Sequence, residues 1–374
     1  MNIKKLLLSA LLLTTTGFAY AEDTTDYFKI DDCVDDNAII AGVDDRTKGI
    51  IKINLVNEYD WVAFQFDLHL PEGVEIGMYK NPRGKLVPDY ANTNRLTDAS
   101  EKDFSYEMNK ISEGVYRFIA YNNSNDQIWV NEDENDLSVF TIRLIATDQA
   151  STGTFTGWIE GAILSNSHDE GQGAQVTGAN CPKTESQFTI QINAKIGEGG
   201  YGSFSWPRDV DFTNDTNVKG IYIPDGTPTE GWLKLKEVTS KKVPAGTGVF
   251  IKGTAGEIVN PETTTSEVTS IEKTLGETSA EPYTAGSNVY ALKTVSGKAG
   301  LHKVNSGVVI PKYKAYLTNT SGAKYFSFGD TATSIDALDM AEEEGDIYTL
   351  GGQKVQKTTM KGVYIKNGQK VVVK

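Results

Sequence analysis

The chain has 374 residues, of which 39% are hydrophobic and 23% charged, enough apolar residues for packed cores. Its 50 acidic and 36 basic residues give a net charge of −14. This balance argues against nucleic acid and anionic membrane surfaces as partners, because both are bound through patches of Lys and Arg. Only three His are present, so metal or general-base chemistry built on imidazole is not expected, and no cofactor is predicted.

The first 21 residues have the pattern of a secretory signal. Lys4 and Lys5 precede a short apolar run, and the segment ends in Ala19-Tyr20-Ala21. Such a small-residue triplet is a typical cleavage site, so we predict cleavage between Ala21 and Glu22. The apolar run is far shorter than the ~20 residues of a spanning helix, and no later stretch is long enough either. The mature chain is therefore expected to be exported, without a transmembrane span.

The two cysteines, Cys33 and Cys181, lie near the ends of the first predicted domain, residues 22–192. Export permits disulfide formation. We predict a Cys33–Cys181 bond that joins the first and last strands and stabilises the domain by several kcal/mol, ~3–5 in the chain-entropy description. The alternative is two buried free thiols.

Nearly all of the first domain has the pattern of β-strands. From Val62 to Leu70, apolar side chains alternate with Ala63, Gln65, Asp67 and His69. This period of two predicts a half-buried strand that is ended by the turn signal Pro71-Glu72-Gly73. Further strands are predicted over 51–55, 116–120, 140–144, 154–164 and 187–192. Strands separated by Gly, Asn and Asp turns, without an amphipathic helix, predict an all-β sandwich.

The block from Trp61 to Val74 resembles the early strand of cohesin-type domains. The order of Tyr116–Tyr121, an acidic loop and Leu137–Ala146 resembles them too. The resemblance implies a jelly-roll sandwich of the kind that cohesins share with several carbohydrate-binding modules. Cohesins bind dockerins and relatives of like fold bind glycans, so the resemblance alone does not choose between a protein and a sugar partner.

Our candidate ligand site lies on the polar side of the Val62–Leu70 strand. Trp61 is expected to share this outward face with Gln65, Asp67 and His69, an aromatic beside hydrogen-bonding groups. Flat exposed aromatics stack on sugar rings, whereas core packing is the usual role of any single tryptophan. The other tryptophans are Trp129, Trp158, Trp206 and Trp232.

No segment carries a catalytic or metal-binding signature. The acidic residues between Asn122 and Asp136 could hold calcium, but they lack the Asp-x-Asp-x-Asp-Gly spacing and are expected to form a solvated loop. Gly197, Gly199 and Gly202 match the dinucleotide fingerprint, but a strand-like segment follows in place of the required helix, so a turn is expected. Paired carboxylates for glycoside hydrolysis are not singled out by any motif.

The remainder of the chain is predicted to be a second β-rich domain over 193–330, an acidic linker over 331–346 and a β tail over 347–374. In the tail, Asn367-Gly368 between alternating residues is a hairpin signal. The tail resembles the end of a type IX secretion C-terminal sorting domain, which implies recognition by that secretion machinery. At about 28 residues it is shorter than a full sorting domain.

These features predict a non-catalytic, exported protein of the outer cell surface. The first domain is expected to bind a polysaccharide or glycoprotein. A protein–protein scaffold or adhesin module that binds a surface protein is the second possibility, and a glycan-processing enzyme is the third. A flat row of exposed aromatics would favour sugar, and a mixed charged patch would favour protein.

Overall fold

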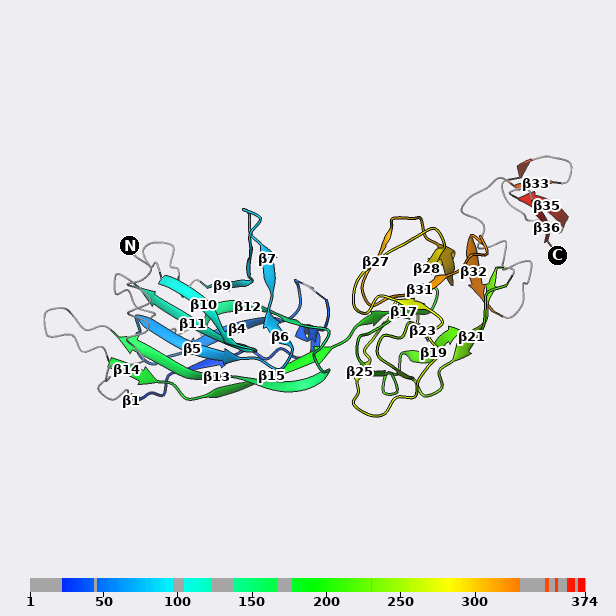
Figure 1. Cartoon of the computed structure of the whole chain (residues 1–374). Coiled ribbons are helices and arrows are strands. Elements are labelled where there is room, and N and C mark those ends of the chain that lie inside the picture. The colour runs from blue at the N-terminus through cyan, green and yellow to red at the C-terminus, as the bar shows by residue number, and fades with distance from the viewer. Residues whose placement is uncertain are drawn as a thin grey trace. The chain divides into compact units, whose positions relative to one another are not determined.

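The computed structural model describes an all-β chain (Figure 1). Its described residues are 22–329 without 44–45, 94, 97–103, 123–136, 167–176 and 230, together with the strands of the C-terminal tail. The predicted signal, the linker, Trp129, His168 and most of the acidic loop lie outside them. The only helical element among them is a single 3-10 turn, η1 (Asp35–Asn37). The chain divides into two compact units between Gln191 and Ile192.

Two sheets make up the first unit. The eight-stranded sheet has the order β1 (Glu22–Asp23), β14 (Thr177–Asn180), β13 (Gly153–Asn166), β5 (Ala63–His69), β11 (Val115–Asn122) and β10 (Phe104–Ser112). In addition, β15 (Thr184–Gln191) pairs with β13, and β3 (Ile39–Ile40) pairs with β15. The five-stranded sheet has the order β2 (Tyr27–Ile30), β4 (Ile50–Val56), β12 (Ser138–Ala146) and β6 (Val74–Ile76), with β9 (Tyr90–Asn92) paired to β12. A separate hairpin of β7 (Met78–Lys80) and β8 (Leu86–Pro88) projects from this unit in Figure 1.

The core of the first unit forms where the inner faces of the two sheets meet. Phe28 of the five-stranded sheet packs on Phe66 of the eight-stranded sheet, with ring centres 4.8 Å apart. Phe66 also contacts Phe118 at 5.2 Å and Phe140 at 6.4 Å. The predicted alternation along β5 is confirmed, because Phe64, Phe66 and Leu68 are buried and the residues between them are not.

The second unit contains several smaller sheets. One consists of β17 (Tyr201–Phe204), β23 (Val249–Gly253), β19 (Val218–Pro224) and β21 (Leu235–Glu237). A six-stranded sheet has the order β20 (Trp232–Leu233), β32 (Tyr325–Phe328), β29 (Lys298–Lys303), β28 (Val289–Val295), β31 (Ala315–Thr318) and β26 (Gly276–Glu277). Phe250, Tyr290, Leu301 and Phe326 belong to the core between them. Gly202 lies in β17, so the glycine fingerprint precedes a strand, as predicted, and not a helix.

Three short sheets complete the second unit, and the tail forms a sheet of its own. The short sheets pair β22 (Lys242–Val243), β18 (Val210–Asp211) and β25 (Glu262–Thr263); β16 (Ala194–Lys195) and β24 (Ile258–Val259); and β27 (Tyr283–Thr284) and β30 (Val309–Ile310). The tail sheet has the order β34 (Lys354–Val355), β33 (Ile347–Thr349), β35 (Gly362–Lys366) and β36 (Gln369–Val373), so the strands predicted there are confirmed. The Asn367-Gly368 turn lies outside the described residues.

Candidate binding face

The outer face of the eight-stranded sheet, called the β5 face below, carries three of the four predicted ligand residues. Gln65, Asp67 and His69 are half-buried and point away from the core, because they alternate with the buried side chains of β5. Neighbouring strands place polar partners beside them. Arg117 of β11 and Glu160 of β13 both lie opposite Asp67, and Trp158 of β13 lies opposite His69.

Two polar side-chain pairs link neighbouring strands on this face: one joins residues directly opposite each other, and the other joins diagonal neighbours. Nε and Nη2 of Arg117 donate to the two carboxylate oxygens of Asp67, each at 2.7 Å. His69 Nε2 lies 2.9 Å from Glu160 Oε1. The bond to Asp67 raises the pKa of the Arg117 guanidinium and outweighs the opposing effect of its burial. A bidentate pair of this kind fixes both side chains in one orientation and presents them as a unit.

The Trp158 ring on β13 is contacted by side chains from both neighbouring parts of the sheet. The His69 ring stacks on it at 4.7 Å with an interplanar angle of 11°. Lys183 lies just before β15, the strand on the other side of β13, and its Nζ is 4.6 Å from the ring centre. Lys183 also pairs with Glu185 at 3.0 Å. Contacts from both neighbours therefore occupy the indole, and its Nε1 is buried without a hydrogen-bond partner.

An apolar centre adjoins the charged rows. Ile119 of β11 and Ile163 of β13 flank Gln65, and Tyr121 lies opposite Ala63. All four of these apolar or aromatic side chains are half-buried. The β5 face thus combines a small apolar centre with paired charges beside it, which is the composition of a protein-interface core and its polar rim.

The expectation that Trp61 lies on this outward face is wrong. Its side chain is 7% exposed, and its indole Nε1 donates to Asp26 Oδ2 at 2.6 Å. The alternation of β5 begins at Ala63, and the two preceding residues, Trp61 and Val62, are both buried. The acceptor comes from a residue 35 positions earlier, just before β2, which no local pattern could reveal.

The predicted Cys33–Cys181 disulfide is also wrong, because both cysteines are free thiols. The backbone of Cys33 forms an isolated β-bridge with Phe188. Phe188 lies opposite Phe155, near one end of β13. Cys181 donates its backbone N–H to Ala162, seven residues further along β13. At ~3.3 Å per strand residue this offset is about 23 Å, far beyond the ~7 Å limit between bridged Cα atoms. Burial raises the pKa of both thiols to about 12, and for Cys181 the charge of Asp26 adds to it.

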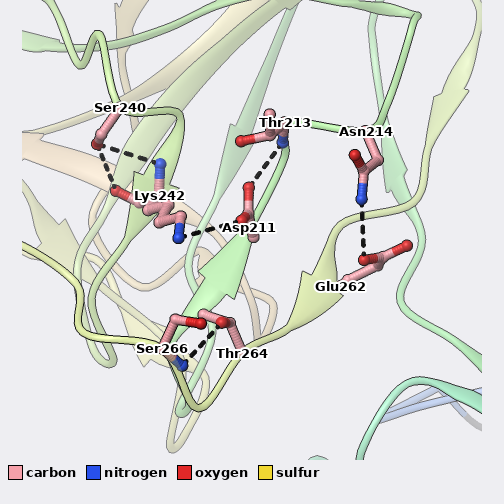
Figure 2. Close-up of polar contacts among 8 residues, drawn as sticks. All are labelled: Asp211, Thr213, Asn214, Ser240, Lys242, Glu262, Thr264 and Ser266. Atoms are coloured by element: carbon pink, nitrogen blue, oxygen red, sulfur yellow. Dashed lines mark hydrogen bonds and ion pairs between the residues drawn. The ribbon is translucent and has the colours of Figure 1, made fainter.

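In the second unit, polar side chains gather at a short sheet. Trp206 is 2% exposed. In the sheet of β22, β18 and β25, Asp211 lies between Lys242 and Glu262. Asp211 Oδ1 accepts the Thr213 N–H at 2.8 Å (Figure 2). Burial opposes ionisation of Asp211, but the bonds from Thr213 and the charge of Lys242 outweigh it and lower its pKa. These contacts order the adjoining turn.

Among the described residues, no group of three or more His, Cys, Asp or Glu is close enough together to hold a metal ion. No helix in the described part of the chain has the length and apolar character to cross a membrane.

Comparison with known proteins gives no family for the chain. It matches no protein-family model and no curated protein.

Proposed function

We propose that this chain is a non-catalytic, exported binding protein whose first unit is a cohesin-like jelly-roll sandwich, and that the β5 face binds a protein partner. The observation that carries the proposal is the combination of the Arg117–Asp67 pair with the half-buried Ile119, Ile163 and Tyr121. Arg and Tyr are enriched among the residues that dominate binding energy at protein interfaces. Glycoprotein partners are included, provided that the protein part makes the contact.

Polysaccharide binding at this face is the weaker alternative. A sugar platform needs an exposed aromatic plane, whereas Trp61 is buried and Trp158 is contacted by both His69 and Lys183. Glycoside hydrolysis is weaker still. Both oxygens of Asp67 are bonded to Arg117, and Glu160 is paired with His69, so neither carboxylate is free to exchange a proton with a substrate.

The charge of the first unit indicates what kind of protein it would bind. Residues 22–191 contain 30 acidic and 13 basic side chains, a net charge of −17, whereas residues 192–374 contain 20 acidic and 21 basic ones. Charges of one sign accelerate encounters with partners of the other sign. The partner is therefore expected to present a basic rim around an apolar or aromatic centre, and its association rate should fall as the salt concentration rises.

The test is a parallel capture experiment with the mature chain, residues 22–374, on insoluble polysaccharides and on cell-surface extract. A captured protein is then purified and its affinity measured against Arg117→Ala and Tyr121→Ala, with Lys219→Ala in the second unit as the control. We expect each face variant to weaken binding at least tenfold and the control to have no effect. Polysaccharide binding that is lost in Trp158→Ala, or protein binding indifferent to Arg117 and Tyr121, would contradict the proposal.

The proposed cell-surface location depends on the tail, which we propose is read by the type IX secretion machinery. Four short strands presented after a charged segment are better suited to recognition than to stabilising the chain. Deletion of residues 347–374 should leave melting of the remaining chain nearly unchanged and retain the protein in the periplasm. Protease accessibility on intact cells measures this, and equal exposure of both forms would remove the sorting function.

A further inference from the structure

The outer face of the five-stranded sheet, called the β4 face below, differs in chemistry from the β5 face. Its inner side buries Ile51 and Ile53, and the residues between them point outward. Lys52 lies opposite Thr141 of β12, and Ile50 lies opposite Arg143. One strand further, Lys29 of β2 is exposed on the same side of the sheet.

A hollow of about 140 Å³ opens on this face. Ile50, Ala91 and Thr141 line it together with Asp89, Arg46 and Arg143. The Arg143 side chain is only 5% exposed and is fixed in place, since Nε donates to Asp89 Oδ2 at 2.5 Å and Nη2 to the Met78 carbonyl at 3.0 Å. Arg46 is 64% exposed and reaches the same Asp89 oxygen at 3.5 Å. The hollow therefore presents an apolar side, a carboxylate, a hydroxyl and guanidinium donors.

Basic side chains are concentrated on this side of the unit. Seven of the 13 basic residues of the unit lie on the β4 face or on the β7–β8 hairpin beside it: Lys29, Arg46, Lys52, Lys80, Arg83, Lys85 and Arg143. The hairpin contains no acidic residue between Met78 and Pro88 and is tied to the face by Arg46, whose guanidinium lies 5.5 Å from the Tyr79 ring centre.

Five of these cations have no counterion among the described residues. Lys29, Lys52, Lys80, Arg83 and Lys85 are exposed and make no ion pair within the described chain. On the eight-stranded sheet, by contrast, Arg117 is paired with Asp67, Lys183 with Glu185, and Lys110 with Glu75 and Glu113. Asp31 lies beside Lys52, because its backbone N–H donates to the Lys52 carbonyl at 3.1 Å, whereas the hairpin has no acidic residue of its own. The positive field is therefore expected to be strongest at the hairpin, and exposed charges beyond ~8–10 Å do not cancel it in physiological salt.

We propose that the β4 face binds an acidic polysaccharide, with one uronic-acid-type ring in the hollow and its neighbours along the unpaired cations. The hollow, at about 140 Å³, is smaller than the ~300–1,000 Å³ pockets that hold drug-sized molecules, so it has room for a single unit of a longer ligand. Arg46 meets the ring carboxylate, while Asp89 and Thr141 meet its hydroxyls and Ile50 meets its apolar side. Lys52 and the hairpin cations meet the carboxylates of adjoining rings.

An acidic peptide is the nearest competitor for the same cations. The Asp89 carboxylate discriminates between the two, because it can accept hydrogen bonds from sugar hydroxyls but repels the side chains of a peptide that offers carboxylates alone. This site is independent of the proposed partner of the β5 face, since the two lie on different sheets.

The test is affinity electrophoresis of the mature chain, residues 22–374, in gels containing polygalacturonate, dextran or polyglutamate. We expect retardation by polygalacturonate, none by dextran and weaker retardation by polyglutamate. Arg46→Glu and Lys52→Glu should each weaken the polygalacturonate affinity at least tenfold. Lys219→Glu, which reverses an exposed lysine of the second unit without an ion pair in the described chain, is the matched control and should have no effect.

Both substituted residues are exposed on the β4 face or its rim, so the variants are expected to fold, which circular dichroism will verify. Absence of retardation by polygalacturonate overturns the proposal. So does retardation that the two variants leave intact, and so does polyglutamate binding as tight as that of polygalacturonate, which would assign the face to acidic peptides.

Discussion

The two outer faces of the first unit use their charged residues in opposite ways. On the β5 face, Arg117 and Lys183 are paired with carboxylates of the same sheet, and the pairs border a half-buried apolar centre. On the β4 face, Arg143 is buried as an anchor while Lys29 and Lys52 have no described counterion. Paired charges beside apolar surface suit a shaped protein partner, whereas unpaired cations suit a repeating anion. One small unit thus offers two chemically distinct surfaces.

We expect the largest loss of stability from Arg143, and a much smaller one from Arg117. Arg143→Ala removes the guanidinium that holds Asp89 and the Met78 carbonyl, and should lower the free energy of unfolding by about 3 kcal/mol, as for other buried pairs that lose one partner. Arg117→Ala removes an ion pair whose arginine side chain is 33% exposed. It should lower the free energy of unfolding by less than about 1 kcal/mol, because water screens the pair. Urea unfolding followed by fluorescence measures both, and equal losses would contradict the contrast.

The next effect distinguishes a buried tryptophan from one on the β5 face. Trp61→Phe leaves the Asp26 carboxylate, which is 1% exposed, without the indole donor, and should cost about 2 kcal/mol. Trp158→Phe loses no hydrogen bond, since its Nε1 has none, and should cost about 1 kcal/mol or less. Thermal melting compares the pair. A larger loss for Trp158 would show that it, and not Trp61, belongs to the core.

A smaller effect is expected where the hairpin meets the β4 face. A Cβ at Gly77 would lie 2.5 Å from Arg143 Cζ, so Gly77→Ala must displace the guanidinium and should cost about 1–2 kcal/mol. Gly84→Ala at the tip of the hairpin is the comparison: a Cβ there meets nothing within 4 Å, and only its φ of +74° is unfavourable. Added to Arg143→Ala, Gly77→Ala should have almost no further effect, because the clash is gone. Additive losses would contradict this coupling.

The smallest effects concern the thiols. Without reductant, both cysteines should react with a maleimide in denaturant and neither should react rapidly in the folded protein at pH 8, because the thiolate is the reactive form. Their folded pKa of about 12 lies above the ~8.5 of a free thiol, so the folded state retains the protons. The contribution of the two protonated thiols to the free energy of unfolding is intact below about pH 8.5 and decreases as the pH rises toward 12. If no thiol is labelled in denaturant without reductant, the two cysteines form a disulfide and the prediction of free thiols is wrong.

The all-β class, the strand over Ala63–His69 and its inward and outward sides could be predicted from the amino-acid pattern, because side-chain alternation is a local property with a period of two. The pattern also indicated Gln65, Asp67 and His69 as outward residues. The alternation could not be extended to Trp61, since the chain enters the strand through a segment whose burial depends on Asp26, a distant residue.

Which residues of different strands meet could not be predicted from the amino-acid pattern. The register of β5 with β11 and β13 brings Arg117 to Asp67 and Trp158 to His69, and the register of β12 with β4 places Arg143 beside Ile50. Strand pairing also holds Cys33 and Cys181 far apart along the sheet. Their positions near the two ends of the unit in the sequence had suggested a disulfide bond. Register is a property of strand pairs, fixed by the packing of whole sheets, and no single strand encodes it.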